Sequence, residues 1–531
     1  MAKIIINDWS KGLAPRYYQG GFNLAKLAVD GMYADGVINP IFYSGFLSPA
    51  SSVFTNYSNI TALTANQRII KFQSVDDGNF TGTSVYFIQG EKVHAFDPAT
   101  FSIINAAEFP HTINATAGTH SGHTSETVQD IVFYQVNGAD KLCYFYIDNT
   151  DGDMGTYDLA SSFTINSANE NVWSSAAGGA VFNKNFPIIA EVADNGFMYV
   201  ANGQNIYKYN GTSAGGTLGT VTSLLDFGIN RKVVDMKDGL GKMWIVISEA
   251  ESTTTLLSNI NRFFQVGIWN RSSTVLSFDD SIPITGIYEV SSLFFWKGIP
   301  HLFTIGGYED SVVQLRTWNG REFEVIQEIG DALTIPANRN AVILIGLGII
   351  WHAKNGKIFF YGKIAPGFPE GLYKVGISPA STNKTGAIFK QSNNIIPMSF
   401  NDGTDERLAY WTLGTGDTSA QGDWYSKIYE LPKLSKLTGM TLYFPVLSGG
   451  SNVNATVKLY KNYSATSLGS FSVNLQDDGN RGYKYFPLGG ETFENINAIQ
   501  MEIEFPTNVA TASNIRFSRI EIDYEITDKK I

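Results

Sequence analysis

Short apolar runs recur along most of the chain, and turns rich in Gly, Asn, Asp and Pro separate them. Apolar and polar residues alternate strictly over 500–505 and 519–524, whereas 341–351 is almost continuously apolar. Alternation predicts strands with one solvated face, and short continuous runs predict strands covered on both faces. Helix-like spacing occurs only over 22–32, so we predict an all-β protein.

One local pattern repeats: a strand ends on an aromatic residue that Asn or Asp follows. Its clearest copy is Trp318-Asn319-Gly320, and Asn-Gly predicts a type I′ hairpin turn, which needs positive φ at both central residues. Successive copies are separated by 61, 52, 60, 49 and 55 residues. A loose repeat near fifty residues with a β pattern is typical of propeller blades. The aromatic residues of the six copies are Phe96, Tyr157, Tyr209, Trp269, Trp318 and Tyr373.

These patterns divide the chain into four parts. We predict an irregular, aromatic-rich N-terminal arm over 1–60 and a six- or seven-bladed β-propeller over 61–412. A Gly-, Ser- and Thr-rich linker follows over 413–423, and 424–531 is predicted to form a jelly-roll-like β-sandwich. The arm has no core of its own, so we expect it to dock on its own propeller and supply a closing strand, or on a neighbouring subunit.

The composition supports an all-β fold and argues against some classes of binding partner. Charged residues make up 16% of the chain and Gly occurs 52 times, which suits many short strands joined by tight turns. A net charge of −11 argues against binding nucleic acid or anionic membrane over the whole surface. The single cysteine, Cys143, excludes an intrachain disulfide, and its apolar neighbours predict a buried, inert thiol.

Candidate chemistry is sparse. Ser74-Val75-Asp76-Asp77-Gly78-Asn79-Phe80-Thr81 fits the Asp-box of sialidase-like propellers, which is a turn device rather than a catalytic motif. A sialidase would also need three arginines to hold a carboxylate, and no spacing marks such a triad. The six-residue segment Asp148 to Asp153 is rich in oxygen ligands, but its spacing departs from the calcium-loop pattern, so we predict a solvated turn. His111, His120 and His123 lack partners at zinc-ligand spacing.

No nucleophile elbow, phosphate-binding loop or zinc-protease motif occurs in the sequence. We therefore assign no catalytic, cofactor-binding or metal-binding residues, expect no cofactor, and predict a non-enzymatic protein. The aromatic–Asn–Gly tips are predicted to anchor hairpins, with sugar stacking as the alternative. No apolar run is long enough to span a bilayer, and the N-terminal apolar run is too short for a signal peptide.

The opening segment Asn7-Asp8-Trp9-Ser10-Lys11-Gly12-Leu13, together with the architecture of the whole chain, resembles virion proteins of tailed bacteriophages. Nozzle and hub proteins of short-tailed phages are similar in their irregular arm, degenerate blades and appended sandwich. The resemblance implies a virion-tail protein, made in the host cytoplasm, that forms a ring near the DNA exit channel. Its implied partners are other tail proteins, copies of itself and passing DNA. Two alternatives are a protein that recognises host-surface glycans and a sialidase-like enzyme that cleaves them.

Overall fold

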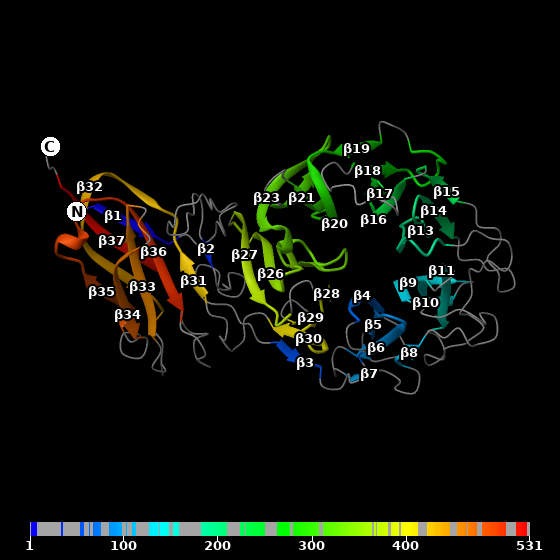
Figure 1. Cartoon of the computed structure of the whole chain (residues 1–531), viewed down its shortest axis with the longest axis horizontal. Coiled ribbons are helices and arrows are strands. Elements are labelled where there is room, and N and C mark those ends of the chain that lie inside the picture. The colour runs from blue at the N-terminus through cyan, green and yellow to red at the C-terminus, as the bar shows by residue number, and fades with distance from the viewer. Residues whose placement is uncertain are drawn as a thin grey trace.

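A computed structural model gives the architecture of the chain. It describes residues 2–7, 33–34, 54–57, 63, 67–75, 84–97, 102–103, 109–112, 127–136, 139–147, 152–158, 182–209, 223–228, 230–249, 263–276, 280–306, 312–363, 366–367, 369–380, 384–391, 395–412, 422–445, 454–462, 464, 466–474, 481–505 and 517–527. In this part of the chain, strands form a seven-bladed propeller and a separate antiparallel sheet beside it (Figure 1). The predicted all-β class is confirmed, and the number of blades is seven.

Each blade is one antiparallel sheet, and in blades 1 to 6 the strands follow the chain from the axis outward (Figure 1). Blade 1 contains β4 (Ile69–Val75), β5 (Ser84–Gln89), β6 (Lys92–Asp97), β7 (Ser102–Ile103) and β8 (His111–Thr112). Blade 2 contains β9 (Thr127–Val136), β10 (Ala139–Ile147) and β11 (Gly152–Asp158). Blade 3 contains β12 (Ile188–Val192), β13 (Met198–Asn202), β14 (Asn205–Tyr209) and β15 (Ser223–Asp226). Blades 4 and 5 contain β16 (Arg231–Gly239), β17 (Lys242–Glu249), β18 (Phe264–Trp269) and β19 (Ser281–Ile284), then β20 (Ile287–Trp296), β21 (Ile299–Gly306), β22 (Val312–Trp318) and β23 (Phe323–Asp331). Blade 6 contains β24 (Val342–Ile345), β25 (Gly348–His352), β26 (Lys357–Lys363) and β27 (Glu370–Ile377).

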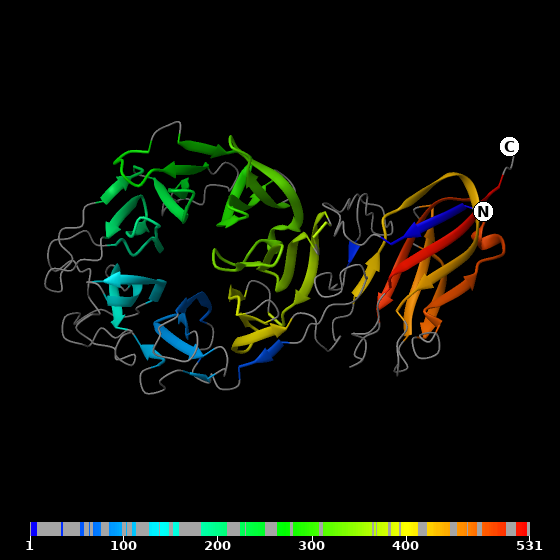
Figure 2. The same ribbon diagram turned by 180° about the vertical axis from the view of Figure 1, so that it is seen from behind.

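Blade 7 is completed by the N-terminal arm. Three of its strands are β28 (Thr385–Ile388), β29 (Ile395–Asn401) and β30 (Glu406–Thr412), and the fourth is β3 (Phe54–Asn56). β3 runs antiparallel to β30, with Thr55 opposite Tyr410. This is the closing strand that the arm was predicted to supply, and it ties the start of the propeller to its end (Figure 2).

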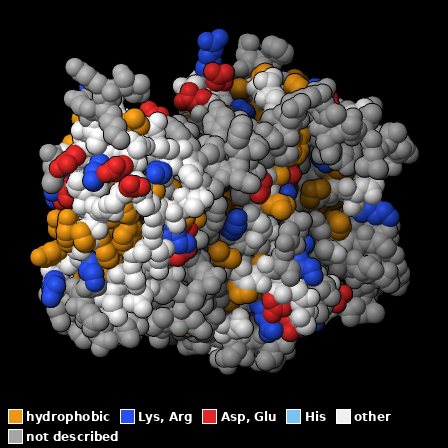
Figure 3. Space-filling model, turned by 60° about the vertical axis from the view of Figure 1, so that its left-hand side comes forward, with side chains coloured by type: hydrophobic (Ala, Val, Ile, Leu, Met, Phe, Trp, Pro, Cys, Tyr) orange, Lys and Arg blue, Asp and Glu red, His pale blue; other side chains and the backbone are white. Residues whose placement is uncertain are grey.

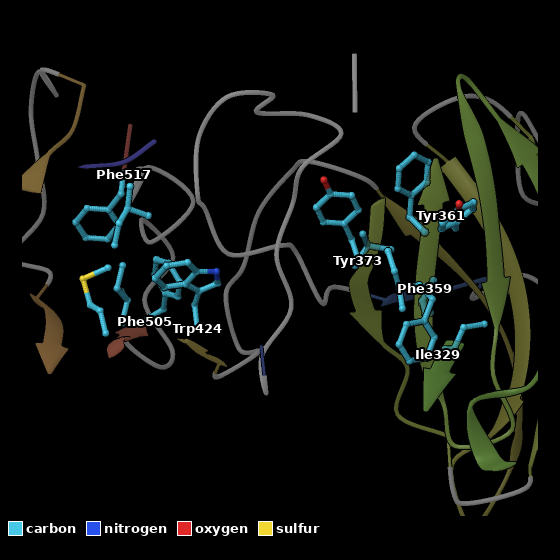
Figure 4. Packing of buried hydrophobic residues seen from close by; sticks show 14 of the residues in the cluster. Ile329, Phe359, Tyr361, Tyr373, Trp424, Phe505 and Phe517 are labelled. Atoms are coloured by element: carbon cyan, nitrogen blue, oxygen red, sulfur yellow. The ribbon is translucent and has the colours of Figure 1, made fainter. Parts of the chain in front are cut away.

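Aromatic side chains fill the spaces between blades. The rings of Phe303 and Trp351 lie 4.9 Å apart between blades 5 and 6, and Tyr199 meets Trp269 edge-on at 5.4 Å between blades 3 and 4. Figure 4 shows Tyr361 and other buried side chains of this region as sticks. Strands such as β25 are therefore covered on both faces, which explains the apolar run over 348–351.

The Asn-Gly hairpin exists, but its predicted turn type is wrong. The turn between β22 and β23 centres on Gly320 and Arg321, and only Gly320 has positive φ, at 100°. Asn319 lies one position earlier, where its side-chain oxygen accepts hydrogen bonds of 2.9 Å from the backbone N–H groups of Arg321 and Glu322. Asn270 does the same in blade 4, so the repeated Asn caps a turn through its side chain.

The C-terminal strands form one antiparallel sheet that curls on itself. Its strands are β31 (Gly422–Tyr425), β32 (Tyr429–Tyr443), β33 (Asn454–Lys461), β34 (Ser467–Asn474), β35 (Tyr483–Pro487), β36 (Ile496–Phe505) and β37 (Arg519–Ile526), together with β1 (Ala2–Ile6) and β2 (Tyr33–Ala34) from the arm. The first half of β32 pairs with β36, whereas its second half pairs with β35 and β37. β31 begins within the segment that was predicted to be a linker.

The curl brings two rows of apolar side chains into one core. Ile520 and Ile522 of β37 face inward with Met501 and Ile503 of β36, and all four belong to one buried cluster. β1 adds a fourth strand beside β37, β32 and β35, with Ile4 opposite Ile522. The arm therefore contributes strands to both the propeller and the sheet. Within the described residues, no helix is long and apolar enough to cross a membrane.

Candidate functional site

The axis of the propeller holds a compact cluster of charged side chains. Asp130 of β9 and Asp235 of β16 are completely buried there, in blades 2 and 4. Lys71 of β4 and Arg339, from the connection between β23 and β24, lie against them. Burying an unpaired charge costs several kcal/mol, so the contacts of these groups determine what the cluster does.

β-Bulges place these side chains in the innermost strands. Lys71, Asp130, Asp235 and Ser292 each come directly after a residue that has no partner in the neighbouring strand. A bulge bends the strand and re-aims the side chains that follow it. The same device in blades 1, 2, 4 and 5 therefore brings polar residues of apolar strands to equivalent positions.

Each aspartate joins its own blade to the next one. Asp130 accepts hydrogen bonds from Lys71 Nζ at 2.6 Å and from the backbone N–H of Ala190, in blade 3, at 2.8 Å. Asp235 accepts one of 2.8 Å from the backbone N–H of Leu293, in blade 5. Each carboxylate thus accepts a hydrogen bond from the backbone of the next blade and links two separate sheets.

Arg339 reaches both aspartates. Its guanidinium donates to Asp130 Oδ2 at 2.5 Å and lies 3.8 Å from Asp235 Oδ1. Nearby, Lys237 of β16 pairs with Glu191 of β12 at 3.3 Å, which links blades 3 and 4. The cluster therefore connects blades that are not neighbours, as well as blades that are.

The pKa values of the two aspartates differ because Arg339 lies closer to one of them. Burial by itself raises the pKa of Asp130, but Arg339 and Lys71 outweigh it and lower that pKa to about 2. Burial also raises the pKa of Asp235, and there the more distant Arg339 and Lys237 do not offset the effect. Lys71 has a lowered pKa because its burial outweighs its contact with Asp130.

The cluster is balanced in charge. Three cations, Lys71, Lys237 and Arg339, face three acids, Asp130, Glu191 and Asp235, at the distances given above. Each of the six side chains has a charged partner within the described part of the protein. Its geometry suits a clasp that holds the blades together.

The structure describes only part of the sites that the sequence pointed to. In the Asp-box, Ser74 and Val75 end β4, and residues 76–81 lie outside the described residues. In the acidic loop, only Gly152 and Asp153 are described, both in β11. His111 lies in β8, whereas the other two histidines fall outside the described part. Among described residues, no three His, Cys, Asp or Glu side chains gather as a metal site.

The remaining candidates have structural roles. Cys143 is buried and free, and burial raises the pKa of its thiol, as the prediction of an inert cysteine requires. Trp318 packs edge-on against Trp244 at 5.6 Å, so this repeated aromatic anchors its hairpin. The described axial cluster contains one arginine, paired with acids, rather than the three arginines of a sialidase site.

Sequence reasoning missed the axial cluster. The sequence pattern that could have indicated it is a single acidic residue inside an apolar strand, as in Asp130-Ile131-Val132-Phe133. An acid at such a position must have a partner within the fold, which marks it for attention. The partner itself, Arg339, lies 209 residues away, and no spacing connects the two.

Comparisons with known proteins show only distant structural likenesses. Neither models of known protein families nor curated proteins match the sequence. Among solved structures, Drosophila semaphorin 2a matches with a TM-score of 0.39 and 9% identity, over 68% of this chain and 75% of that one. The WD40 repeats of RRP9 match with a TM-score of 0.39 and 9% identity, over 68% of this chain and 100% of that one. These distant likenesses are to propellers and say nothing of function.

Proposed function

We propose that this protein is a non-enzymatic structural component of a bacteriophage tail. In this role, copies of the chain assemble through the arm and the propeller into a ring of the nozzle or hub type. The resemblance of Asn7 to Leu13 and of the overall architecture to phage tail proteins motivates the proposal. The charge-balanced axial cluster is the structural observation that favours it.

The axial cluster supports a scaffold because its charged groups are used inside the protein. A catalytic site needs titratable groups that can reach a substrate. Here Asp130, Asp235 and Arg339 contact one another or the backbone of adjoining blades. Such a propeller is a rigid spacer, and any DNA passage in the assembly lies between subunits rather than along the axis of one propeller.

The proposal is tested by asking whether purified phage virions contain this chain. Mass spectrometry of purified virions, with subunit counting by cryo-electron microscopy, is expected to detect it in several copies around the tail axis. The purified chain is expected to form closed oligomers in sedimentation experiments. A strictly monomeric chain that is absent from virions would overturn the proposal.

A further inference from the structure

The outer face of the C-terminal sheet carries a second group of polar and aromatic side chains. It lies on the layer formed by β35, the second half of β32, β37 and β1. We call it the tyrosine face and define it by Tyr443, Tyr483, Tyr485, Arg519, Glu521, Asp523 and Lys3. Figure 3 turns this end of the molecule forward and shows apolar side chains gathered there beside acidic and basic ones.

Strand register places all seven side chains on one side of the layer. Tyr483 is opposite Tyr443, which is opposite Arg519. The next row on the same side consists of Tyr485, Thr441 and Glu521, which lie opposite one another in adjacent strands. Alternate residues of these strands, such as Leu442 and Ile520, are buried in the core, so the register fixes which side chains point out.

The aromatic half of the face is accessible. Tyr483 and Tyr485 are each 50% exposed. The rings of Tyr443 and Tyr483 lie 6.3 Å apart with a 36° angle between their planes. Tyr485 lies across β32 over Gly439, because a Cβ built on that glycine would come within 2.6 Å of its hydroxyl oxygen. A glycine inside a strand often marks such a close approach.

The polar half offers hydrogen-bond donors and acceptors in fixed positions. Glu521 is buried and accepts hydrogen bonds from Lys3 Nζ at 2.9 Å and from the hydroxyl of Tyr443 at 3.4 Å, and it also pairs with Arg519. Hydrogen bonding from Lys3 lowers the pKa of Glu521, so this carboxylate remains charged. Asp523 lies 3.5 Å from Lys3.

Packing alone explains only part of this arrangement. An aromatic ring that covers a glycine on the neighbouring strand stabilises a sheet, which accounts for Tyr485. It does not account for Tyr483, which extends the aromatic surface toward the edge and leaves half of its area in solvent. Lys3 and Arg519 also keep 48% and 43% of their side-chain area in solvent. The face therefore combines accessible ring area with accessible hydrogen-bond donors.

The balance of charge indicates the class of ligand. Lys3 and Arg519 offset Glu521 and Asp523, so the face is neutral. A nucleic acid or another polyanion would need an excess of cations. A protein interface normally has an apolar, uncharged centre, whereas here the row that contains the exposed Ile5 also contains the buried carboxylate of Glu521. Flat rings beside fixed donors and acceptors suit a neutral, polyhydroxylated ligand, since sugar rings present C–H groups on one face and hydroxyls at the rim.

We propose that the tyrosine face binds a neutral saccharide. Tyr483 and Tyr485 form the stacking platform, and the half-exposed Arg519, which Glu521 holds in place, bonds to hydroxyl groups at the rim of the sugar. The inference does not rest on the tail role, because it follows from this face alone.

The full-length chain on an array of neutral and acidic oligosaccharides, including bacterial surface polysaccharides, tests the proposal. We expect retention on at least one neutral glycan, and at least tenfold weaker retention for Tyr483→Ala and Tyr485→Ala. Phe263→Ala is the matched control, since Phe263 is an exposed aromatic residue of the propeller, 39% accessible. It is expected to leave retention unchanged, and thermal unfolding checks that all variants fold.

Three results would overturn the proposal. One is an array on which no neutral glycan retains the chain. Another is retention that both tyrosine variants preserve. The third is a change of oligomeric state in Tyr485→Ala without glycan binding, since this would assign the face to contact with a second copy of the chain. Virion association is measured separately, so failure here leaves the tail proposal standing.

Discussion

The propeller axis and the tyrosine face use the same residue types in opposite ways. In both, acids pair with Lys and Arg at hydrogen-bonding distance. At the axis the carboxylate of Asp130 is fully buried and its partners come from other blades. On the tyrosine face the partners of Glu521 reach solvent, with Lys3 and Arg519 about half exposed at 48% and 43%. Pairing of charges thus holds the fold at one site and leaves groups available for a ligand at the other.

The largest expected effect is on stability and comes from breaking the axial cluster. Asp130→Ala leaves Lys71 and Arg339 buried without their main partner, which typically costs about 3 to 5 kcal/mol. Urea unfolding followed by tryptophan fluorescence measures the change. Glycan retention at a temperature where the variant is folded is expected to be unchanged. A loss below 1 kcal/mol would contradict the description of the cluster as a clasp.

A pH effect is expected at the seam between blades 7 and 1. Burial raises the pKa of Glu406 from its usual 4.5 to about 7, and Arg68 only partly opposes this. A carboxyl with a raised pKa in the folded state stabilises the protein below about pH 4.5, and this contribution is lost as the pH rises through about 7. Its full size is about 3 kcal/mol, at about 1.4 kcal/mol per pKa unit.

Glu406→Gln tests this directly. The variant is expected to unfold at a higher temperature than the parent chain at pH 8, with a much smaller difference at pH 5. Differential scanning calorimetry at both values measures it. A difference of equal size at the two pH values would refute the role of ionisation.

A smaller effect, on binding rather than stability, is expected from Gly439→Ala. The added methyl group displaces the ring of Tyr485 without removing it. Glycan retention is expected to fall by about tenfold, or roughly 1.4 kcal/mol, while the unfolding free energy changes by less than about 1 kcal/mol. Unchanged retention would show that the position of the Tyr485 ring does not matter.

The smallest effect is expected at an exposed ion pair on the propeller. Asp402 accepts a hydrogen bond of 3.0 Å from Arg407 Nε, and both side chains are partly exposed. Arg407→Ala is expected to cost about 0 to 1 kcal/mol in urea unfolding, because solvent and salt screen such pairs. A loss as large as that of Asp130→Ala would remove the distinction between buried and exposed pairs.

Regular features of the fold could be predicted from the sequence. The repeat of aromatic–Asn/Asp strands indicated blades, and the apolar runs 395–398 and 407–411 coincide with β29 and β30. β31 was missed because it is short and follows a Gly-, Ser- and Thr-rich segment, and the first half of β32 was missed because Pro432 and three lysine and glutamate residues interrupt its pattern. The pairing of β1 with β37 joins the two ends of the chain, and local patterns carry no information about such distant partners.

The functional residues were harder to predict. The axial cluster depends on bulges that turn Lys71, Asp130 and Asp235 to the axis, and a one-residue bulge leaves no clear mark in the sequence. The tyrosine face depends on register, because Tyr483 and Arg519 are brought together only by their common neighbour, Tyr443. The alternating residues around Tyr485 indicated a strand, but not what its outer face meets.

A double-mutant cycle between Asp130 and Arg339 is the most direct test of the axial clasp. The free energies of unfolding of Asp130→Asn, Arg339→Gln and the double variant are compared with that of the parent chain. Since the guanidinium of Arg339 lies 2.5 Å from the fully buried carboxylate of Asp130, we expect a coupling free energy of about 1.5 to 3 kcal/mol. Additive effects, with coupling below about 0.3 kcal/mol, would contradict the account.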